Sequence, residues 1–208
     1  MTGWPTPVAG ARARSRPDPE QGVTFVELLI ALTVVAVVVA FAVPTTAATV
    51  DAGRVGHAAG MMAGRFRLAR QEAVAQSRSV GVVFDQANGR WTFRICVDGN
   101  GNGIRRAEIA SGTDRCVEGP VDVEAMFPGI RIDVDPLVRG PGGEPPSPDA
   151  VRFGAGDLAS FSPLGSCTSG TLFLRSPLGA LYAVRIGGAT GRTRVLRYDR
   201  ASAAWLDV

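Results

Sequence analysis

The sequence predicts an α+β protein in which one long helix precedes a domain of antiparallel sheets. Residues 23–43 form an apolar stretch, and from Val55 to Ala73 apolar residues recur at steps of four and three. After Ser79 the pattern changes to short β-type runs separated by glycine-rich breaks. Strands that follow one long helix, without further helical periodicity, are typical of the α+β class. About 165 residues follow residue 43, enough for one domain with a core.

The apolar stretch at 23–43 is long enough to cross a membrane once. At 1.5 Å per residue, its roughly 21 residues span about 31 Å, close to the thickness of the hydrocarbon core. Basic residues precede it at Arg12, Arg14 and Arg16, and little basic charge follows it directly. The positive-inside bias therefore predicts a cytoplasmic amino terminus and an extracytoplasmic domain.

Glu27 is the one charged residue in this stretch. A charge inside a bilayer costs at least about 2.5–3.5 kcal/mol on insertion scales, so such a residue usually marks a partner or a function. The partner we expect is a positive charge on another subunit. A secretory signal peptide cut near Thr46-Ala47-Ala48 is the alternative, although its apolar region would be unusually long and would contain a carboxylate.

We expect the helix to continue over residues 44–78. Pro44 lies just past the apolar stretch, where its ring kinks a helix without necessarily ending it. His57, the only histidine, falls off the apolar stripe and is interpreted as a solvated residue rather than a ligand. The stripe predicts a face that packs on a globular domain. It consists of Val55, Ala59, Met62, Phe66, Ala69 and Ala73, and the residues mostly off it are Arg54, Arg65, Arg67, Arg70 and Glu72.

Residues 79–208 are predicted to form a β-rich domain. Runs at 80–85 and 91–97 flank Ala87-Asn88-Gly89, and Asn-Gly between two apolar runs is a strong hairpin signal. The segment 136–148 is dense in Pro and Gly and is expected to be a surface loop or a disordered insertion. Further strands are predicted at 130–134, 151–153, 171–175, 181–186 and 193–198.

The residues around Glu27 resemble a known processing signal. The run from Gly22 through Val23-Thr24-Phe25-Val26-Glu27-Leu28-Leu29 is similar to the cleavage site of type IV prepilins and pseudopilins. The resemblance implies a leader peptide at 1–22, removed by a prepilin peptidase between Gly22 and Val23, and methylation of the new amino terminus. Val23 stands where the family usually has phenylalanine. The implied fold is the type IV pilin-like fold, with the helix at 23–43 in the bacterial inner membrane.

The carboxy-terminal third resembles the GspH/FimT group of minor pilins and pseudopilins. The matching runs are Phe161-Ser162-Pro163-Leu164-Gly165-Ser166, Ser169-Gly170-Thr171-Leu172, Ala183-Val184-Arg185-Ile186 and Gly191-Arg192-Thr193-Arg194. One branch of this group belongs to type II secretion and another to type IV pili. The resemblance implies a minor subunit that assembles with other pilins or pseudopilins on an inner-membrane platform.

The arginine-rich tail supplies a second functional hypothesis. The Gly-Arg-Thr-Arg run looks like the DNA-binding tail of the FimT branch, and Arg192 and Arg194 would point to one face of a strand and reach adjacent phosphates. With Arg197, they are the candidate residues for DNA binding during uptake. Arginines that alternate with Val195 and Tyr198 are equally typical of the solvated face of an edge strand.

Three cysteines in an exported domain indicate an oxidising compartment. Cys96 and Cys116 bracket a glycine-rich excursion, and a bridge closing a loop of about twenty residues would contribute on the order of 3 kcal/mol. We expect that pair, which leaves Cys167 free or bound elsewhere. A pairing of Cys167 with either of the other two stays open.

The excursion contains Asp98-Gly99-Asn100-Gly101-Asn102-Gly103, which matches the first half of a calcium loop. Asp98, Asn100 and Asn102 are therefore candidate Ca²⁺ ligands. The second half of the loop fails, because Ile109 occupies position twelve and Glu108 comes one residue too early. Asn and Gly at this density are equally expected in a tight, exposed turn.

Nothing in the sequence indicates catalysis or a required cofactor. There is no G-x-S-x-G elbow, no P-loop, no dinucleotide fingerprint and no second histidine for a metal pair. The net charge of +3 predicts no bulk affinity for polyanions. We therefore expect a substrate of processing enzymes rather than an enzyme.

Overall fold

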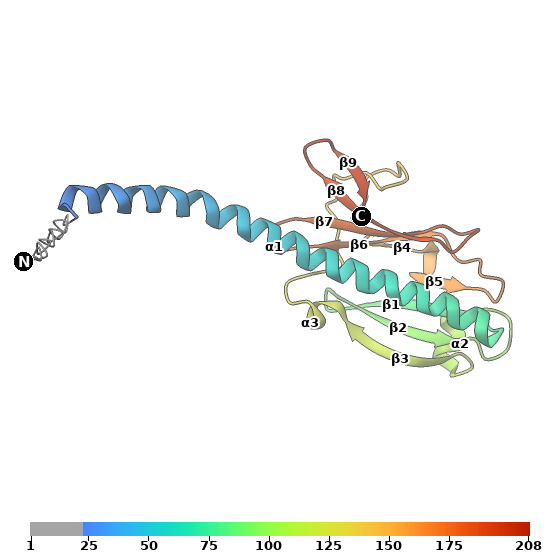
Figure 1. Cartoon of the computed structure of the whole chain (residues 1–208). Coiled ribbons are helices and arrows are strands. Elements are labelled where there is room, and N and C mark those ends of the chain that lie inside the picture. The colour runs from blue at the N-terminus through green and yellow to red at the C-terminus, as the bar shows by residue number, and fades with distance from the viewer. Residues whose placement is uncertain (1–22) are drawn as a thin grey trace, which may run out of the picture. The chain divides into compact units, whose positions relative to one another are not determined.

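The computed structural model describes residues 23–208, apart from the side chains of residues 43–45. The chain divides into two compact units whose boundary falls between Val43 and Pro44. Helix α1 (Phe25–Gln76) begins in the first unit and ends in the second (Figure 1). Its backbone stays helical through Pro44.

Both ends of α1 have identifiable caps. At the start, the Thr24 hydroxyl accepts a hydrogen bond from the Glu27 N–H at 3.2 Å, in a Thr-x-x-Glu pattern typical of helix amino termini. At the end, Ser77 adopts a left-handed conformation with φ 50°. The following N–H, of Arg78, turns back to the Ala73 carbonyl at 3.2 Å and satisfies one of the last carbonyls.

Two antiparallel sheets make up the rest of the second unit. The first has the strand order β3-β2-β1-β5, and the second has the order β4-β6-β7-β8-β9. The strands of the first sheet are β1 (Val80–Ala87), β2 (Arg90–Val97), β3 (Arg115–Asp122) and β5 (Leu158–Phe161). Those of the second are β4 (Val151–Arg152), β6 (Gly170–Arg175), β7 (Leu181–Ile186), β8 (Thr193–Asp199) and β9 (Ala204–Asp207). Short helices lie at α2 (Arg106–Ser111), α3 (Val123–Met126) and η1 (Gly154–Gly156).

The predicted hairpin is present as β1 and β2, paired from Val80↔Val97 to Ala87↔Arg90. Asn88 and Gly89 connect them with φ values of 53° and 76°. Two successive positive φ angles are those of a type I′ turn, whose twist matches that of the flanking strands. The local Asn-Gly signal therefore predicted this hairpin correctly.

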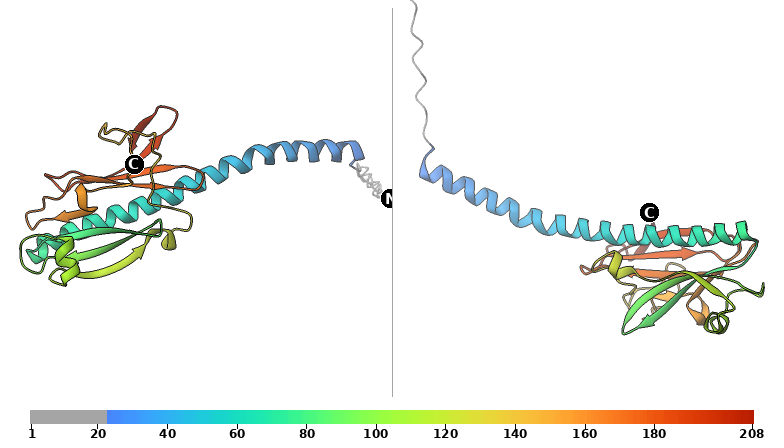
Figure 2. Two further views of the ribbon diagram at one scale, coloured as in Figure 1. Left: turned by 180° about the vertical axis from the view of Figure 1, so that it is seen from behind. Right: turned by 90° about the horizontal axis from the view of Figure 1, so that it is seen from below.

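The second half of α1 packs across both sheets, as the two views of Figure 2 show. All six residues of the predicted stripe are fully buried. At its centre, the Phe66 ring lies 5.5 Å from the Phe153 ring, 6.2 Å from Phe84 and 6.4 Å from Phe161, measured between centroids. One cluster thus joins the helix to strands of both sheets. The predicted α+β, pilin-like architecture is confirmed.

One predicted strand is absent, and three observed strands were not predicted. Residues 130–134 were expected to form a strand, yet only Arg131 makes a bridge, to Arg175. Ile130, Ile132 and Val134 are buried at every second position, as in a strand. The segment nevertheless has no continuous hydrogen-bonded pairing with a neighbouring strand. The strands β3, β5 and β9 were not predicted: β3 contains charges and Gly119-Pro120, while β5 and β9 have four residues each.

The segment 136–148 lies over the second sheet. Glu144 forms an ion pair with Arg185 of β7, with an N–O distance of 2.9 Å. The Trp205 ring N–H of β9 donates to the Arg139 carbonyl at 2.8 Å. The segment has no helix or strand of its own, and these two contacts attach it to the sheet.

The aromatic cluster yields a stability prediction. Replacing Phe66→Ala removes the ring at the junction of helix and sheets, and we expect a loss of about 3–5 kcal/mol in the free energy of unfolding. Leu68→Ala, on the same helix but 40% exposed, is the matched control and should lose less than about 1 kcal/mol. Urea unfolding of residues 44–208, followed by tryptophan fluorescence, measures both. Equal losses in the two variants would contradict the packing described.

Candidate assembly site

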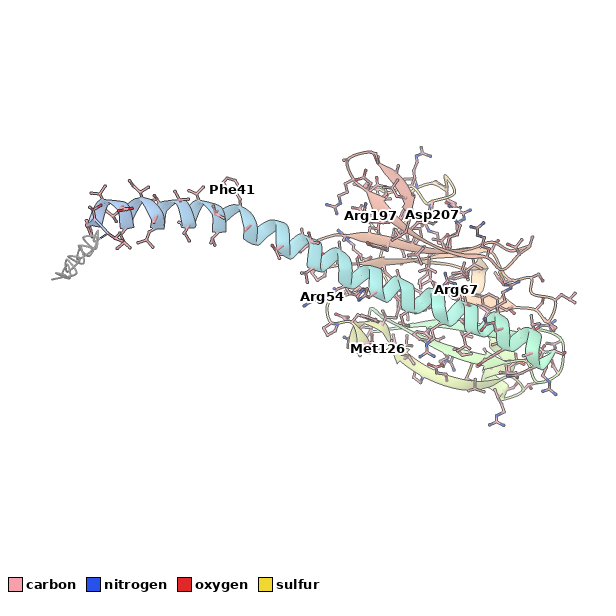
Figure 3. The ribbon with its side chains drawn as sticks, in the orientation of Figure 1. Phe41, Arg54, Arg67, Met126, Arg197 and Asp207 are labelled. Carbon is pink, nitrogen blue, oxygen red and sulfur yellow. A yellow bond between two sulfur atoms is a disulfide. The ribbon has the colours of Figure 1, made fainter. Side chains whose placement is uncertain are left out.

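The first half of α1 exposes nearly all of its apolar surface. The large apolar side chains from Val23 to Phe41 are 45–74% exposed, whereas the later stripe is fully buried. An 18-residue window of the helix has a mean hydropathy of 2.8, and none of it is buried. Figure 3 shows the side chains of this segment, with Phe41 labelled, projecting away from the helix. By length and composition, α1 is a candidate membrane-spanning helix.

Glu27 lies in the first turn of this exposed helix. Its side chain makes no ion pair with any residue in the range 23–208. The amino-terminal end of a helix carries partial positive charge, which favours a carboxylate there but does not neutralise it. Val23, one turn earlier, is 71% exposed. Gly22, the other predicted processing residue, lies outside the described residues.

Comparison with known families decides the identity of the chain. A family model described as the prokaryotic N-terminal methylation motif matches residues 18–43. The model of the type II transport protein GspH matches residues 58–191, more than half of the chain. The chain belongs to the GspH family. No curated protein and no solved structure matches it.

The bounds of the two family matches agree with the division of α1 into an exposed first half and a buried second half. The methylation motif ends at residue 43, where the first unit ends, and the GspH match begins on the buried half of the helix and runs to Gly191. This GspH-family chain is therefore a pilin-like subunit of a type II secretion or type IV pilus system. The predicted resemblance to minor pilins and pseudopilins is confirmed.

The three cysteines lie in the second unit. Cys96 of β2 and Cys116 of β3 are bonded to each other, and Cys167 carries a half-buried free thiol. Burial raises the pKa of the Cys167 thiol, although the nearby Arg70 guanidinium opposes the shift. The disulfide closes the excursion that contains the Asp98 turn.

The candidate calcium residues hold the turn in another way. The buried Asp98 carboxylate accepts backbone N–H groups from Asn100 at 3.0 Å, Gly101 at 2.8 Å and Gly103 at 2.7 Å. The Asn100 and Asn102 side-chain amides donate instead to Glu108, at 3.0 and 2.8 Å. Within residues 23–208, no group of three or more His, Cys, Asp or Glu side chains could hold a metal. In the structure, the Asp98 carboxylate therefore accepts hydrogen bonds from backbone N–H groups of the turn. The side-chain amides of the two asparagines point toward Glu108.

The arginines of the tail are not gathered on one face. Arg194 of β8 pairs with Asp207 of β9, its Nε lying 3.1 and 3.0 Å from the two carboxylate oxygens. Side chains alternate along a strand, so Arg197, three residues on, lies on the opposite face of β8 from Arg194. Figure 3 labels Arg197 and Asp207 on this hairpin. Arg192 precedes β8 and is exposed.

Sequence reasoning missed two arginines that lie near this tail. Arg67 and Arg70 of α1 line a pocket together with Arg192 and its neighbours. Their positions off the apolar stripe predicted only that they face outward. More than one hundred residues separate Arg67 and Arg70 from Arg192. The local sequence pattern therefore could not predict that these side chains lie close together.

The Asp98 turn yields a pH prediction. Burial by itself raises the pKa of the Asp98 carboxyl, but hydrogen bonds from the Gly103, Gly101 and Asn100 N–H groups outweigh it and hold the pKa below its usual value. The ionised Asp98 carboxylate therefore stabilises the folded state fully at pH values above its unfolded pKa of about 3.9. This stabilisation is lost as the pH falls through the lower pKa of the folded state.

We expect Asp98→Asn to reduce the free energy of unfolding by about 1–3 kcal/mol at pH 7. The difference from the wild-type protein should shrink below about pH 3.9. Asp135→Asn, which removes a carboxylate bonded to one exposed backbone N–H at 3.1 Å, is the control and should change little. Urea unfolding of residues 44–208 across this pH range provides the measurement. A difference that stayed constant down to pH 2.5 would rule out the carboxylate's role.

Proposed function

We propose that this GspH-family chain is a low-abundance pseudopilin or pilin, processed between Gly22 and Val23 and assembled through residues 23–43. A prepilin peptidase would remove the leader and methylate Val23. The anchor would rest in the inner membrane, with its amino terminus cytoplasmic and the domain extracytoplasmic, until an assembly platform passes it into a bundle with other major and minor subunits. The observation that carries the proposal is the apolar window in the first half of α1, which is wholly unburied and has one carboxylate, Glu27, in the first turn of the helix.

Assembly through residues 23–43 is physically reasonable because their exposed apolar surface requires apolar surroundings. Both lipid tails and a bundle of like helices cover apolar side chains, so transfer between them exposes little apolar surface to water. Glu27 is tolerated in such a setting only with a partner, because an uncompensated charge in a medium of low dielectric constant is strongly disfavoured. Cleavage after Gly22 would create a suitable partner, the positive amino terminus at the start of a neighbouring mature chain.

Removal of the carboxylate tests this role. In Glu27→Leu the anchor becomes more apolar, so insertion into the membrane should be retained. Incorporation into fibres should fall about tenfold or more, since the neighbour's amine would be left unpaired. Quantitative blotting of sheared fibres against the membrane fraction measures both quantities.

Glu72→Gln provides the control, because it removes a carboxylate from the second half of the same helix. It should assemble normally. Wild-type incorporation of Glu27→Leu would refute the proposed pairing.

Processing is tested one step earlier. A bulky side chain at the cleavage point, as in Gly22→Val, should block the peptidase and leave the longer precursor in the membrane. Intact-mass spectrometry distinguishes precursor from mature chain, and Gly10→Val, within the predicted leader, is the control that should still be cut. A mature mass for Gly22→Val would place the cleavage elsewhere.

Geometry gives less support to DNA binding through Arg192, Arg194 and Arg197 during uptake. Arg194 is engaged by Asp207, and Arg197 lies on the other face of the strand. That function stays a prediction from the sequence, and assembly is the function that the described residues support best.

A further inference from the structure

We infer that the end of the domain where α1 enters it docks on the surface of an anionic bilayer while residues 23–43 span that bilayer. The inference rests on the proposed membrane anchor and adds to it a second contact, made by the folded domain. Figure 3 labels Arg54 and Met126 at this end of the second unit. The docking residues, here called the basal surface, are Met126, Phe127 and Pro128 after α3, Pro177 and Leu178 between β6 and β7, and the exposed Arg54 and Arg200.

The turn between β6 and β7 presents a leucine at its tip. Leu178 is 62% exposed. Pro177 precedes it with the fixed φ that favours the second position of a turn, and the Gly179 N–H closes the turn on the Ser176 carbonyl at 3.0 Å. The Ser176 hydroxyl donates to the Asp51 carboxylate of α1. The leucine is therefore held in place beside the helix.

The turn after α3 lies against the first turn. Gly129 occupies its third position with φ 85°, the positive angle that a type II turn requires there. The Ile130 N–H donates to the Phe127 carbonyl at 2.9 Å and closes this turn. A Cβ on Gly129 would come within 2.9 Å of the Pro177 ring, so the two turns are in contact. Both are ordered before any partner arrives, which lowers the entropy lost on docking.

Arg54 and the second turn enclose a hollow of about 340 Å³. Met126, at its edge, is 42% exposed, and the other lining residues, Phe127, Pro128 and Ile130, are also apolar. A cation beside exposed apolar side chains is typical of surfaces at a membrane interface. There the apolar groups reach the boundary of the acyl chains while the charged head stays among the lipid headgroups.

The charges left free on the basal surface are positive. Arg54 and Arg200 form no ion pair within residues 23–208. Arg200 donates to the Gly179 carbonyl at 2.8 Å, which holds its guanidinium beside the leucine turn. Anionic headgroups are the complement of such a surface. The carboxylates at this end already have partners: Asp51 is bonded to Ser176, Glu124 to Arg90 and Arg131, and Asp133 to Arg175.

The anchor keeps the basal surface close to the bilayer. Asp51, which holds the leucine turn, follows Val43 by eight residues. These residues correspond to about 12 Å of rise in a helix, and to about 29 Å even in a fully extended chain. The headgroup region extends about 5–8 Å beyond each side of the hydrocarbon core. Such a short tether gives the surface a high effective concentration of headgroups.

These features favour a bilayer over a neighbouring subunit as the partner. The exposed apolar side chains stand at the tips of narrow turns, whereas a stable protein interface needs about 800 Å² of complementary surface on each partner. The bilayer is also present beside the tethered domain from the moment the anchor inserts, before any fibre exists.

The test uses the mature chain, residues 23–208, inserted in vesicles of equal parts phosphatidylcholine and phosphatidylglycerol. In a Cys167→Ser background, Met126→Cys and Leu178→Cys each carry an environment-sensitive fluorophore, and lipids with a quencher near the top of the acyl chain should quench it. Leu164→Cys is the matched control. Leu164 is a 95% exposed leucine in another turn, beside Arg70 in the second half of α1, and its probe should be quenched several-fold less.

Substitution of the arginines tests the charge. The quenched fraction of the probe at position 178 gives the ratio of docked to undocked domain. Arg54→Ala and Arg200→Ala should each lower this ratio about fivefold, the change expected for one basic side chain at an anionic surface. Arg78→Ala, which removes an exposed arginine just past the other end of α1, should leave it unchanged. Vesicles of phosphatidylcholine alone, or added salt, should also lower the ratio.

A probe in the anchor separates the failure of this inference from the failure of the proposed function. If Val35→Cys is quenched and the probes at 126 and 178 are quenched no more than that at 164, docking is overturned and the anchor stands. If no probe is quenched, both are overturned. Probes at 126 and 178 that escape quenching in vesicles but are shielded in assembled fibres would assign the surface to a neighbouring subunit, and docking on lipid is again overturned. Glu27→Leu should leave the quenching unchanged.

Discussion

No described residue of the chain packs against the apolar surface on the first half of α1. This surface therefore requires lipid or other helices around it, and the rest of the structure is arranged around that requirement. A helix that is apolar on all sides is stable only where lipid or other helices surround it. The second half of the same helix is instead covered by its own chain. There the apolar residues form one stripe, and that stripe is fully buried against two sheets. One helix thus serves two environments, with its change of character near Pro44.

The contacts that stabilise the folded domain lie within the domain itself. Its core joins both sheets to the helix around Phe66. The bond between Cys96 and Cys116 fastens the edge strand β3, and the Asp98 carboxylate satisfies three N–H groups in the turn beside it. None of these contacts involves residues before Pro44. The contacts that hold the domain together are therefore complete without the anchor, as the proposed transfer from membrane to fibre requires.

Features encoded over a few residues could be predicted from the sequence. The Asn88-Gly89 turn requires two positive φ angles, and the spacing of the apolar stripe requires only the pitch of a helix. The strand predicted at 130–134 failed because alternating burial does not by itself supply a neighbouring strand. The arginines show the same limit. Arg194 is neutralised by Asp207 across a hairpin whose second strand was not predicted, and Arg192 meets Arg67 only after the helix and the sheets have packed together.

The central claim is that Glu27 faces the amino terminus of a neighbouring subunit, and chemical cross-linking tests it most directly. A membrane-permeant carbodiimide activates a buried carboxylate, which then joins to an amine in contact with it. In assembled fibres digested for mass spectrometry, our account predicts an amide between the Glu27 carboxyl and the amino-terminal amine of another subunit. Recovery of Glu27 only as the unlinked carbodiimide adduct, from fibres that contain this chain, would contradict it.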